Sequence, residues 1–203
     1  MGLSVGAVGV EQVNGAGILR RATAQDAPVI GQLVRELGWT LRGRPKRWVG
    51  ILAIGLWVGW TVAVGAIGIA IVGLLLIALV RLALFQYPLV SWTEYWVITV
   101  GTQVVACAKL YEGELTSEIY DVFVVREWRG IGFGQALVKR LMQEARYPVY
   151  LASLPNAIGF YETLGFRVVQ PRSLSPTLQS RLSLTNPSYQ KLGLTPMRWD
   201  NRA

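Results

Sequence analysis

Arg129-Gly130-Ile131-Gly132-Phe133-Gly134 separates two runs of contrasting pattern. The preceding run, 118–125, is rich in β-branched and aromatic residues, which predicts a strand. The following run, 135–142, places apolar residues at helical spacing. Glycines at such a junction allow the free N–H groups of a helix N-terminus to close on an anion, usually a phosphate. The sequence therefore predicts a phosphate-binding turn between a strand and a helix.

Two common phosphate-binding motifs do not fit this turn. A Walker loop needs Gly-Lys-Ser/Thr, which is absent here. A dinucleotide fingerprint is followed by an acidic residue about twenty positions later, and position 154 is a leucine. A second landmark lies a strand and a helix further on, where residues 157–166 read Ala-Ile-Gly-Phe-Tyr-Glu-Thr-Leu-Gly-Phe.

These two segments together resemble the GNAT superfamily of N-acetyltransferases. The turn matches the family's pyrophosphate loop, Gln/Arg-x-x-Gly-x-Gly/Ala, and 157–166 is similar to its Ala-Ile-x-Phe-Tyr-x-x-x-Gly-Phe segment. The resemblance covers about 17–37 and 95–199. It implies an α+β fold, with a mixed, mainly antiparallel sheet flanked by helices.

The remaining elements are predicted from periodicity and turn residues. Thr23 to Asp26 should cap a helix over 27–37, and the segment 171–191 is expected to be a polar excursion. A closing strand over 194–199 is expected at a sheet edge because proline cannot donate a ladder hydrogen bond. Further strands are expected at 18–22, 95–100, 104–110, 149–152 and 166–169, and a further helix at 156–164.

Composition limits the chemistry that the chain can perform. The net charge of +8 indicates anionic partners, namely coenzyme phosphates or acidic lipid, and no basic run with interleaved aromatics supports nucleic acid. The single cysteine, Cys107, excludes an internal disulfide and a thiolate cluster. The absence of histidine excludes histidine-based catalysis and histidine metal ligands, and we expect no metal site.

A long apolar stretch interrupts the chain between the first helix and the second strand. Residues 48–80 contain no charge, and after Arg81 another uncharged run extends to Thr93. An apolar stretch beyond about 18 residues is typical of a membrane segment. A domain this small has no interior for a helix that is apolar on all sides and this long. We therefore predict three parts: a flexible N-terminus over 1–16, a GNAT domain over 17–47 and 93–203, and a membrane insert over 48–92.

The topology of this insert is constrained because the flanking strands must join one sheet. A helical hairpin with its bend at Gly65–Gly68, a re-entrant loop or one long helix lying in the interface would all return the chain to its starting side. Basic residues at 42, 44, 46 and 47 predict that this side is cytoplasmic. Gly55 and Gly59 form a small-xxx-small pair that could pack the two arms, or a second copy in a homodimer.

The resemblance also implies the site. It places the backbone of Val122, Phe123 and Val124 beside the pantetheine of acetyl-CoA, the acyl donor. The pyrophosphate would be held by the loop Arg129, Gly130, Ile131, Gly132, Phe133 and Gly134, with Gln135 adjoining.

Tyr161 occupies the family's general-acid position, near the coenzyme sulfur. A phenol can donate there because its ordinary pKa, about 10, is close to that of the leaving thiol; a core aromatic is the alternative. The expected general base is Glu118, with Tyr120 and Asp121 as alternatives. The asparagine that often precedes the family's last catalytic helix aligns with Leu154, so Asn156 could be a helix cap only.

The sequence thus predicts a membrane-associated N-acyltransferase that moves an acetyl group from acetyl-CoA to an amine acceptor at the cytoplasmic face. The alternative is a non-catalytic acyl-CoA-binding module tethered to the membrane. An intact loop and Tyr161 favour the enzyme. The sequence does not identify the acceptor, which could be a small molecule or a protein amino group.

Overall fold

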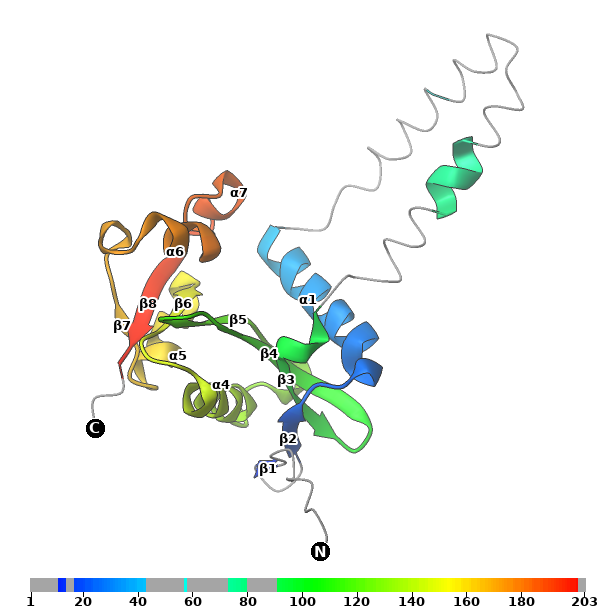
Figure 1. Cartoon of the computed structure of the whole chain (residues 1–203). Helices are drawn as coiled ribbons and strands as arrows, with labels where there is room; N and C mark the ends of the chain where they lie inside the picture. The colour runs from blue at the N-terminus through cyan, green and yellow to red at the C-terminus, as the bar shows by residue number, and fades with distance from the viewer. Residues whose placement is uncertain (1–10, 14–16, 43–56, 58–72, 80–90, 201–203) are drawn as a thin grey trace, which may run out of the picture.

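The computed structural model describes residues 11–13, 17–42, 57, 73–79 and 91–200. Within these ranges eight strands form one sheet, in the order β1-β2-β3-β4-β5-β6-β8-β7 (Figure 1). All neighbouring strands are antiparallel except β5 and β6. The strands are β1 Glu11–Val13, β2 Gly17–Arg21, β3 Tyr95–Val100, β4 Gln103–Glu112, β5 Ser117–Val124, β6 Val149–Ser153, β7 Arg167–Val168 and β8 Thr195–Trp199.

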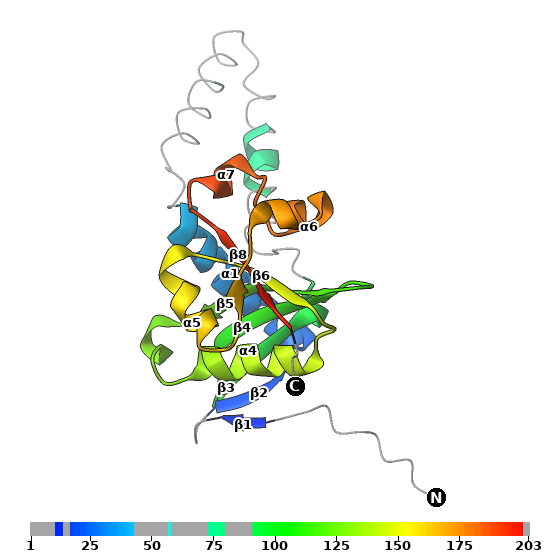
Figure 2. The same cartoon turned by 90° about the vertical axis from the view of Figure 1, so that its left-hand side faces the viewer.

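Helices cover both faces of this sheet, so the predicted α+β fold with a mixed sheet is confirmed (Figures 1 and 2). The helix α1 lies on one face, and α4 lies on the other. The α-helices are α1 Ala27–Arg42, α4 Phe133–Glu144, α5 Ile158–Glu162, α6 Pro176–Arg181 and α7 Pro187–Gln190. Short 3-10 turns lie at Ala24–Asp26, Trp92–Glu94, Arg126–Trp128, Pro155–Ala157 and Pro171–Ser173.

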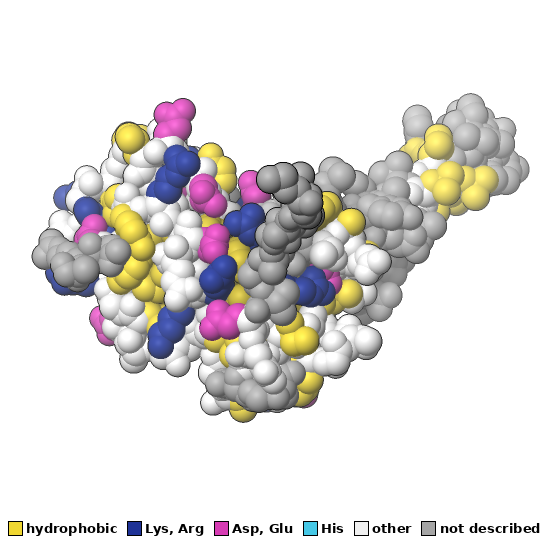
Figure 3. Space-filling view, turned by 60° about the horizontal axis from the view of Figure 1, so that its bottom comes forward, with side chains coloured by type: hydrophobic (Ala, Val, Ile, Leu, Met, Phe, Trp, Pro, Cys, Tyr) yellow, Lys and Arg dark blue, Asp and Glu magenta, His cyan; other side chains and the backbone are white. Residues whose placement is uncertain are grey.

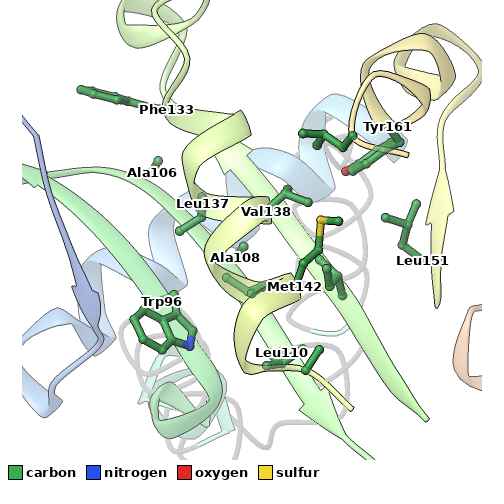
Figure 4. Packing of buried hydrophobic residues seen from close by; sticks show 14 of the residues in the cluster. Trp96, Ala106, Ala108, Leu110, Phe133, Leu137, Val138, Met142, Leu151 and Tyr161 are labelled. Atoms are coloured by element: carbon green, nitrogen blue, oxygen red, sulfur yellow. The ribbon is translucent and has the colours of Figure 1, made fainter. Parts of the chain in front are cut away.

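The main core lies between α4 and the sheet. Leu137, Val138 and Leu141 of α4 are fully buried, and in Figure 4 Leu137 lies beside Ala106 and Ala108 of β4. The spacing of these apolar residues gives α4 one apolar face. A second core packs Ile30 and Leu33 of α1 on the opposite face of the sheet. These two layers hold the β5–α4 junction between them.

The chain enters α1 through a buried ion pair. The guanidinium of Arg20 donates to both carboxylate oxygens of Asp26, at 2.7 and 2.9 Å. The Thr23 backbone N–H also donates to Asp26 Oδ2 at 2.7 Å, which confirms the predicted cap. These contacts, led by the Arg20 hydrogen bond, lower the pKa of Asp26 to about 2.

We expect Asp26→Asn to lower the free energy of unfolding at pH 7 by on the order of 1–2 kcal/mol. The depressed pKa means that the carboxylate stabilises the fold above its unfolded pKa of about 4, and that this contribution disappears as the pH falls to about 2. Urea unfolding of both proteins at pH 7 and pH 2 measures the difference.

A matched variant is Asp200→Asn, which breaks the more exposed pair with Arg198 and should cost less than about 1 kcal/mol. An Asp26→Asn penalty of equal size at both pH values would contradict the assignment.

Two sequence predictions about strands are corrected by the structure. The strand β1 pairs with β2, within a segment expected to be flexible. The strand β8 lies between β6 and β7 and not at the edge. Its Pro196 carbonyl accepts from the Val169 N–H at 3.0 Å, just past the end of the two-residue β7. The N–H and C=O of one strand residue point to the same side, so the missing N–H of Pro196 removes no hydrogen bond between β8 and β6.

The excursion 171–191 contains α6 and α7, which the sequence analysis did not predict. Leu174, Leu178 and Leu182 form a small core against Tyr150 of β6. Ser175 caps α6 by accepting from the Leu178 N–H at 3.3 Å. The segment therefore covers the sheet beside β6.

Most of the predicted membrane insert, 48–92, lies outside the described residues. No helix in the described part of the chain is long and apolar enough to cross a bilayer. Residues 73–79 are helical, and Leu75, Leu76, Ile77 and Leu79 expose 38–60% of their surface. This short helix stands apart from the sheet in both views (Figures 1 and 2), and Figure 3 shows yellow hydrophobic side chains on the projecting part of the chain.

Candidate active site

The site is built where β5 and β6 separate. These parallel strands pair only at Ser117 with Val149 and at Glu118 with Tyr150. Beyond that point no described strand pairs with the edge of β5 that faces β6. Backbone N–H and C=O groups along 119–123 are therefore available on that side to an extended ligand.

A cavity of about 590 Å³, here called the loop cavity, lies in this opening beside the end of β5 and the loop that leads into α4. Its volume lies in the usual range for small-molecule sites, about 300–1,000 Å³. It is lined by Leu37, Leu41, Val122, Phe123, Val124, Trp128, Arg129, Gly130, Gly132, Gly134, Gln135, Leu154, Asn156, Ala157, Phe160, Tyr161 and Thr163.

The loop 129–135 presents the N-terminus of α4 to this cavity. Gly130 and Gly132 adopt φ values of 83° and 91°, a left-handed conformation that favours glycine. The Ala136 N–H closes the first helical turn on the Gly132 carbonyl at 3.0 Å. The N–H groups of residues 133–135 therefore have no partner within the helix, and with the helix dipole they form an anion site.

Arg129 borders the cavity with its side chain folded back on β5. Its Nε donates to the Val124 carbonyl at 2.9 Å, and the guanidinium lies 5.6 Å from the centre of the Phe123 ring. These contacts fix the stem and leave the two terminal nitrogens available to a phosphate.

The structure brings eight of the ten predicted coenzyme residues to this cavity. Ile131 does not line it, and Phe133 is 1% exposed in the core, where its ring stacks on Trp128 at 5.9 Å. Phe133 can contribute its backbone N–H only. The sequence analysis missed Trp128, Phe160 and Thr163 in the lining. Phe160 and Thr163 lie in the same short segment as Tyr161, so their closeness in the sequence could have indicated that they also line the cavity.

Tyr161 lines the loop cavity and also a second one. Its ring packs edge-on against Phe160 and Phe166, so the side chain is held by the core of α5 (Figure 4). Its hydroxyl has no hydrogen-bond partner among the described residues. Burial raises the pKa of Tyr161 to about 12, so the phenol stays protonated through the neutral range. The arrangement offers a free O–H donor at the meeting point of the two cavities.

The second cavity, here called the helix cavity, has a volume of about 270 Å³. It lies between α1, the opening of β5 and β6, and the segment of α6 and α7. It is lined by Val34, Leu37, Gly38, Leu41, Ile119, Tyr120, Asp121, Val122, Leu151, Ala152, Ser153, Leu154, Ala157, Tyr161, Leu182, Ser183, Tyr189 and Leu194.

Asp121 enters the helix cavity because of a bulge in β5. The register with β4 shifts between Cys107 and Lys109, and Asp121 has a φ of 52°. Such a conformation is uncommon for a residue other than glycine and favours Asp and Asn. Neighbouring strand residues normally point to opposite faces, yet Tyr120 and Asp121 both line this cavity. Asp121 Oδ2 accepts from the Tyr95 hydroxyl at 2.6 Å.

Glu118, the predicted base, lies outside the linings of both cavities. It is fully buried, its Oε1 pairs with Arg181 at 2.7 Å, and its Oε2 accepts from the Tyr120 hydroxyl at 2.5 Å. The structure thus places both alternative bases, Tyr120 and Asp121, at the wall of the helix cavity, and places Glu118 behind Tyr120. The catalytic role of Glu118 stays a prediction.

No metal site accompanies this arrangement in the described ranges, where no three His, Cys, Asp or Glu side chains come together as ligands.

Comparison with known proteins shows which family this part of the chain is similar to. Residues 91–168 match the model of the acetyltransferase (GNAT) domain. This part of the chain is similar to a GNAT acetyltransferase domain. The match covers the region from β3 through the loop to Tyr161, and it confirms the predicted enzyme class. No curated protein sequence matches the chain.

Several solved structures are similar in fold to this chain. N-acetylglutamate synthase from Neisseria gonorrhoeae, complexed with coenzyme A and N-acetyl-glutamate, superimposes with a TM-score of 0.59 at 14% identity, over 92% of this chain and 35% of that one. The protein Rv2747 from Mycobacterium tuberculosis, in complex with CoA, gives 0.56 at 20% identity, over 90% and 98%. The PaiA N-acetyltransferase from Thermoplasma acidophilum, in complex with coenzyme A, gives 0.51 at 14%, over 91% and 99%. At these sequence identities the comparison shows a similar fold only.

Proposed function

We propose that this protein transfers an acetyl group from acetyl-CoA to an amine, with the coenzyme in the loop cavity. The observation that carries the proposal is the position of Tyr161, which lines both the cavity bounded by the α4 N-terminus and the adjoining helix cavity. A donor thioester extending from the loop along β5 would reach this junction. The CoA bound in the structural neighbours supports the same donor.

Groups in the described residues could bind the coenzyme and stabilise the leaving thiolate. The N–H groups of residues 133–135 and the nitrogens of Arg129 would bind the pyrophosphate. The backbone edge at Val122 and the Val124 N–H would bond the pantetheine amides, while the Val124 carbonyl accepts from Arg129. The Tyr161 hydroxyl would donate a hydrogen bond to the sulfur as the C–S bond breaks. Because its raised pKa makes the phenol a weaker acid, this donation stabilises the developing thiolate before any full proton transfer.

A coupled thiol-release assay with acetyl-CoA and a panel of amines tests this function. We expect CoA release that depends on the amine, together with an acetylated product of the corresponding mass. Acetyl-CoA binding without amine-dependent release would favour the alternative, a non-catalytic binding module. Failure to bind acetyl-CoA in calorimetry would refute both.

Membrane attachment through 48–92, with the catalytic domain at the cytoplasmic face, is part of the proposal. The uncharged run 48–80 and the exposed Leu75, Leu76 and Leu79 support it, because such apolar surface is unfavourable in water. Gly73 lies against the indole of Trp57 so closely that a Cβ would not fit. One straight helix would separate these residues by about 24 Å. Trp57 and Gly73 are in contact, so the two residues do not belong to one straight helix.

Membrane fractionation tests the attachment. We expect the full-length protein to pellet with membranes and to stay there through an alkaline carbonate wash. Recovery in the supernatant would contradict the proposal. Pairing of two copies through Gly55 and Gly59 stays a prediction, since both lie outside the described residues.

A further inference from the structure

The two cavities together define where the acceptor must sit. They share Leu37, Leu41, Val122, Leu154, Ala157 and Tyr161. If the coenzyme occupies the loop cavity, as the proposed function requires, the thioester reaches Tyr161 from that side. The helix cavity is then the space from which an amine can approach the carbonyl carbon.

The helix cavity has an unusual charge balance for an enzyme of this basic net charge. Asp121 is the only acidic residue in its lining, and no lysine or arginine lines it among the described residues. The neighbouring Arg181 is engaged by Glu118 at 2.7 Å and lies 5.1 Å from the centre of the Tyr111 ring. An acceptor bearing a carboxylate would therefore bring a second negative charge into a space where no described lysine or arginine can pair with it.

The Asp121 carboxylate has one oxygen available to bind a cation. One of its carboxylate oxygens is fixed by the Tyr95 hydroxyl at 2.6 Å, and the other, Oδ1, has no hydrogen-bond partner among the described residues. Burial and the nearby Asp121 charge raise the pKa of Tyr95, so its hydroxyl keeps donating at any working pH. A rigid carboxylate with one free oxygen suits the ammonium of an amine.

The rest of the cavity is shaped for an apolar body. Leu37 and Leu41 come from the last turns of α1, and Leu182 and Leu194 come from the opposite wall. The volume of about 270 Å³ equals that of about nine water molecules, enough for a ring or a short chain.

We propose that the acceptor is a primary amine on an apolar body, with no carboxylate beside the amine, and that Asp121 binds its ammonium and accepts its proton. The ammonium gives one proton to Asp121, and the freed lone pair forms the N–C bond to the acetyl carbon. The C–S bond then breaks, and the second nitrogen proton ends on the sulfur. The inference rests on the proposed function.

Matched amine pairs test the acceptor class on the full-length protein in detergent micelles. Phenethylamine and L-phenylalanine differ only in the carboxylate, as do pentylamine and L-norleucine, and L-glutamate is added as a fifth probe. We expect kcat/KM to be at least 100-fold higher for the amine of each pair, with products identified by mass. Equal or faster acetylation of the amino acids, or acetylation of none of the probes, would overturn the inference.

Asp121→Asn tests the residue. Asparagine still accepts from Tyr95 and tolerates the positive φ, so the fold is retained. We expect kcat/KM for phenethylamine to fall at least 100-fold, with the dissociation constant of acetyl-CoA changed less than twofold. The control Glu114→Gln removes an exposed charge from the β4–β5 loop and should change neither. An Asp121→Asn enzyme as fast as the parent would exclude this role.

A second variant tests the charge argument independently. Leu194→Arg places a cation in a loop wall of the helix cavity and should lower the preference for phenethylamine over L-phenylalanine at least tenfold. An unchanged preference would count against the proposal. Calorimetry with acetyl-CoA separates failure of the acceptor class from failure of the proposed function. A protein that binds acetyl-CoA and acetylates amino acids refutes the acceptor class only. A protein that does not bind it refutes the proposed function.

Discussion

Gly132→Glu should abolish measurable acetyl-CoA binding. Gly132 precedes α4 with a φ of 91° and lines the loop cavity beside the free N–H groups of the helix. A glutamate there adds bulk and a negative charge where the coenzyme phosphates would approach, and the backbone conformation is itself unfavourable for a side chain. Isothermal calorimetry should show a dissociation constant raised by more than about 10³-fold, equivalent to about 4 kcal/mol.

Two further variants separate charge from backbone strain. Gly132→Ala adds the strain without the charge and should weaken binding less. Gly101→Glu adds the same residue at a φ of 58° in the β3–β4 turn, where a Cβ has open space, and should leave the affinity unchanged. If Gly132→Glu binds acetyl-CoA normally with its circular dichroism intact, the loop is not the phosphate site.

Tyr161→Phe should lower kcat by roughly 10²–10³, the usual effect of removing one donor from a developing negative charge. The phenyl ring keeps its packing against Phe160 and Phe166, so only the hydroxyl is lost. The dissociation constant of acetyl-CoA should change little, because the donation strengthens as the thiolate forms. Steady-state kinetics and calorimetry on the same preparation separate the two quantities.

The matched control is Tyr147→Phe. Tyr147 is 42% exposed, lines neither cavity and donates weakly to the Met142 carbonyl at 3.4 Å. Its loss should leave kcat within twofold of the parent. A Tyr161→Phe enzyme that also matches the parent would exclude the phenol as the donor to sulfur.

The sequence by itself determined the loop and the junction that it occupies. Gly130 and Gly132 are required where φ is positive, and apolar residues at helical spacing follow directly, so the strand, turn and helix were all predictable locally. The Phe-Tyr segment likewise placed Tyr161 on a helix. These features depend on contacts between residues that are close in the sequence, so a local sequence pattern predicts them.

Only the tertiary structure decided which acidic residue faces the cavity. The sequence favoured Glu118 as the base, with Tyr120 and Asp121 as alternatives on the same strand. A bulge against β4 turns Asp121 into the helix cavity, whereas Arg181, 63 positions away, holds Glu118 behind Tyr120. Leu37 and Leu41 line the same cavity as residues 119–122 of β5, although they are far from them in the sequence. The strand β8 lies inside the sheet because β7 pairs with its outer edge. Contacts between distant segments fix these positions, and a local pattern carries no information about them.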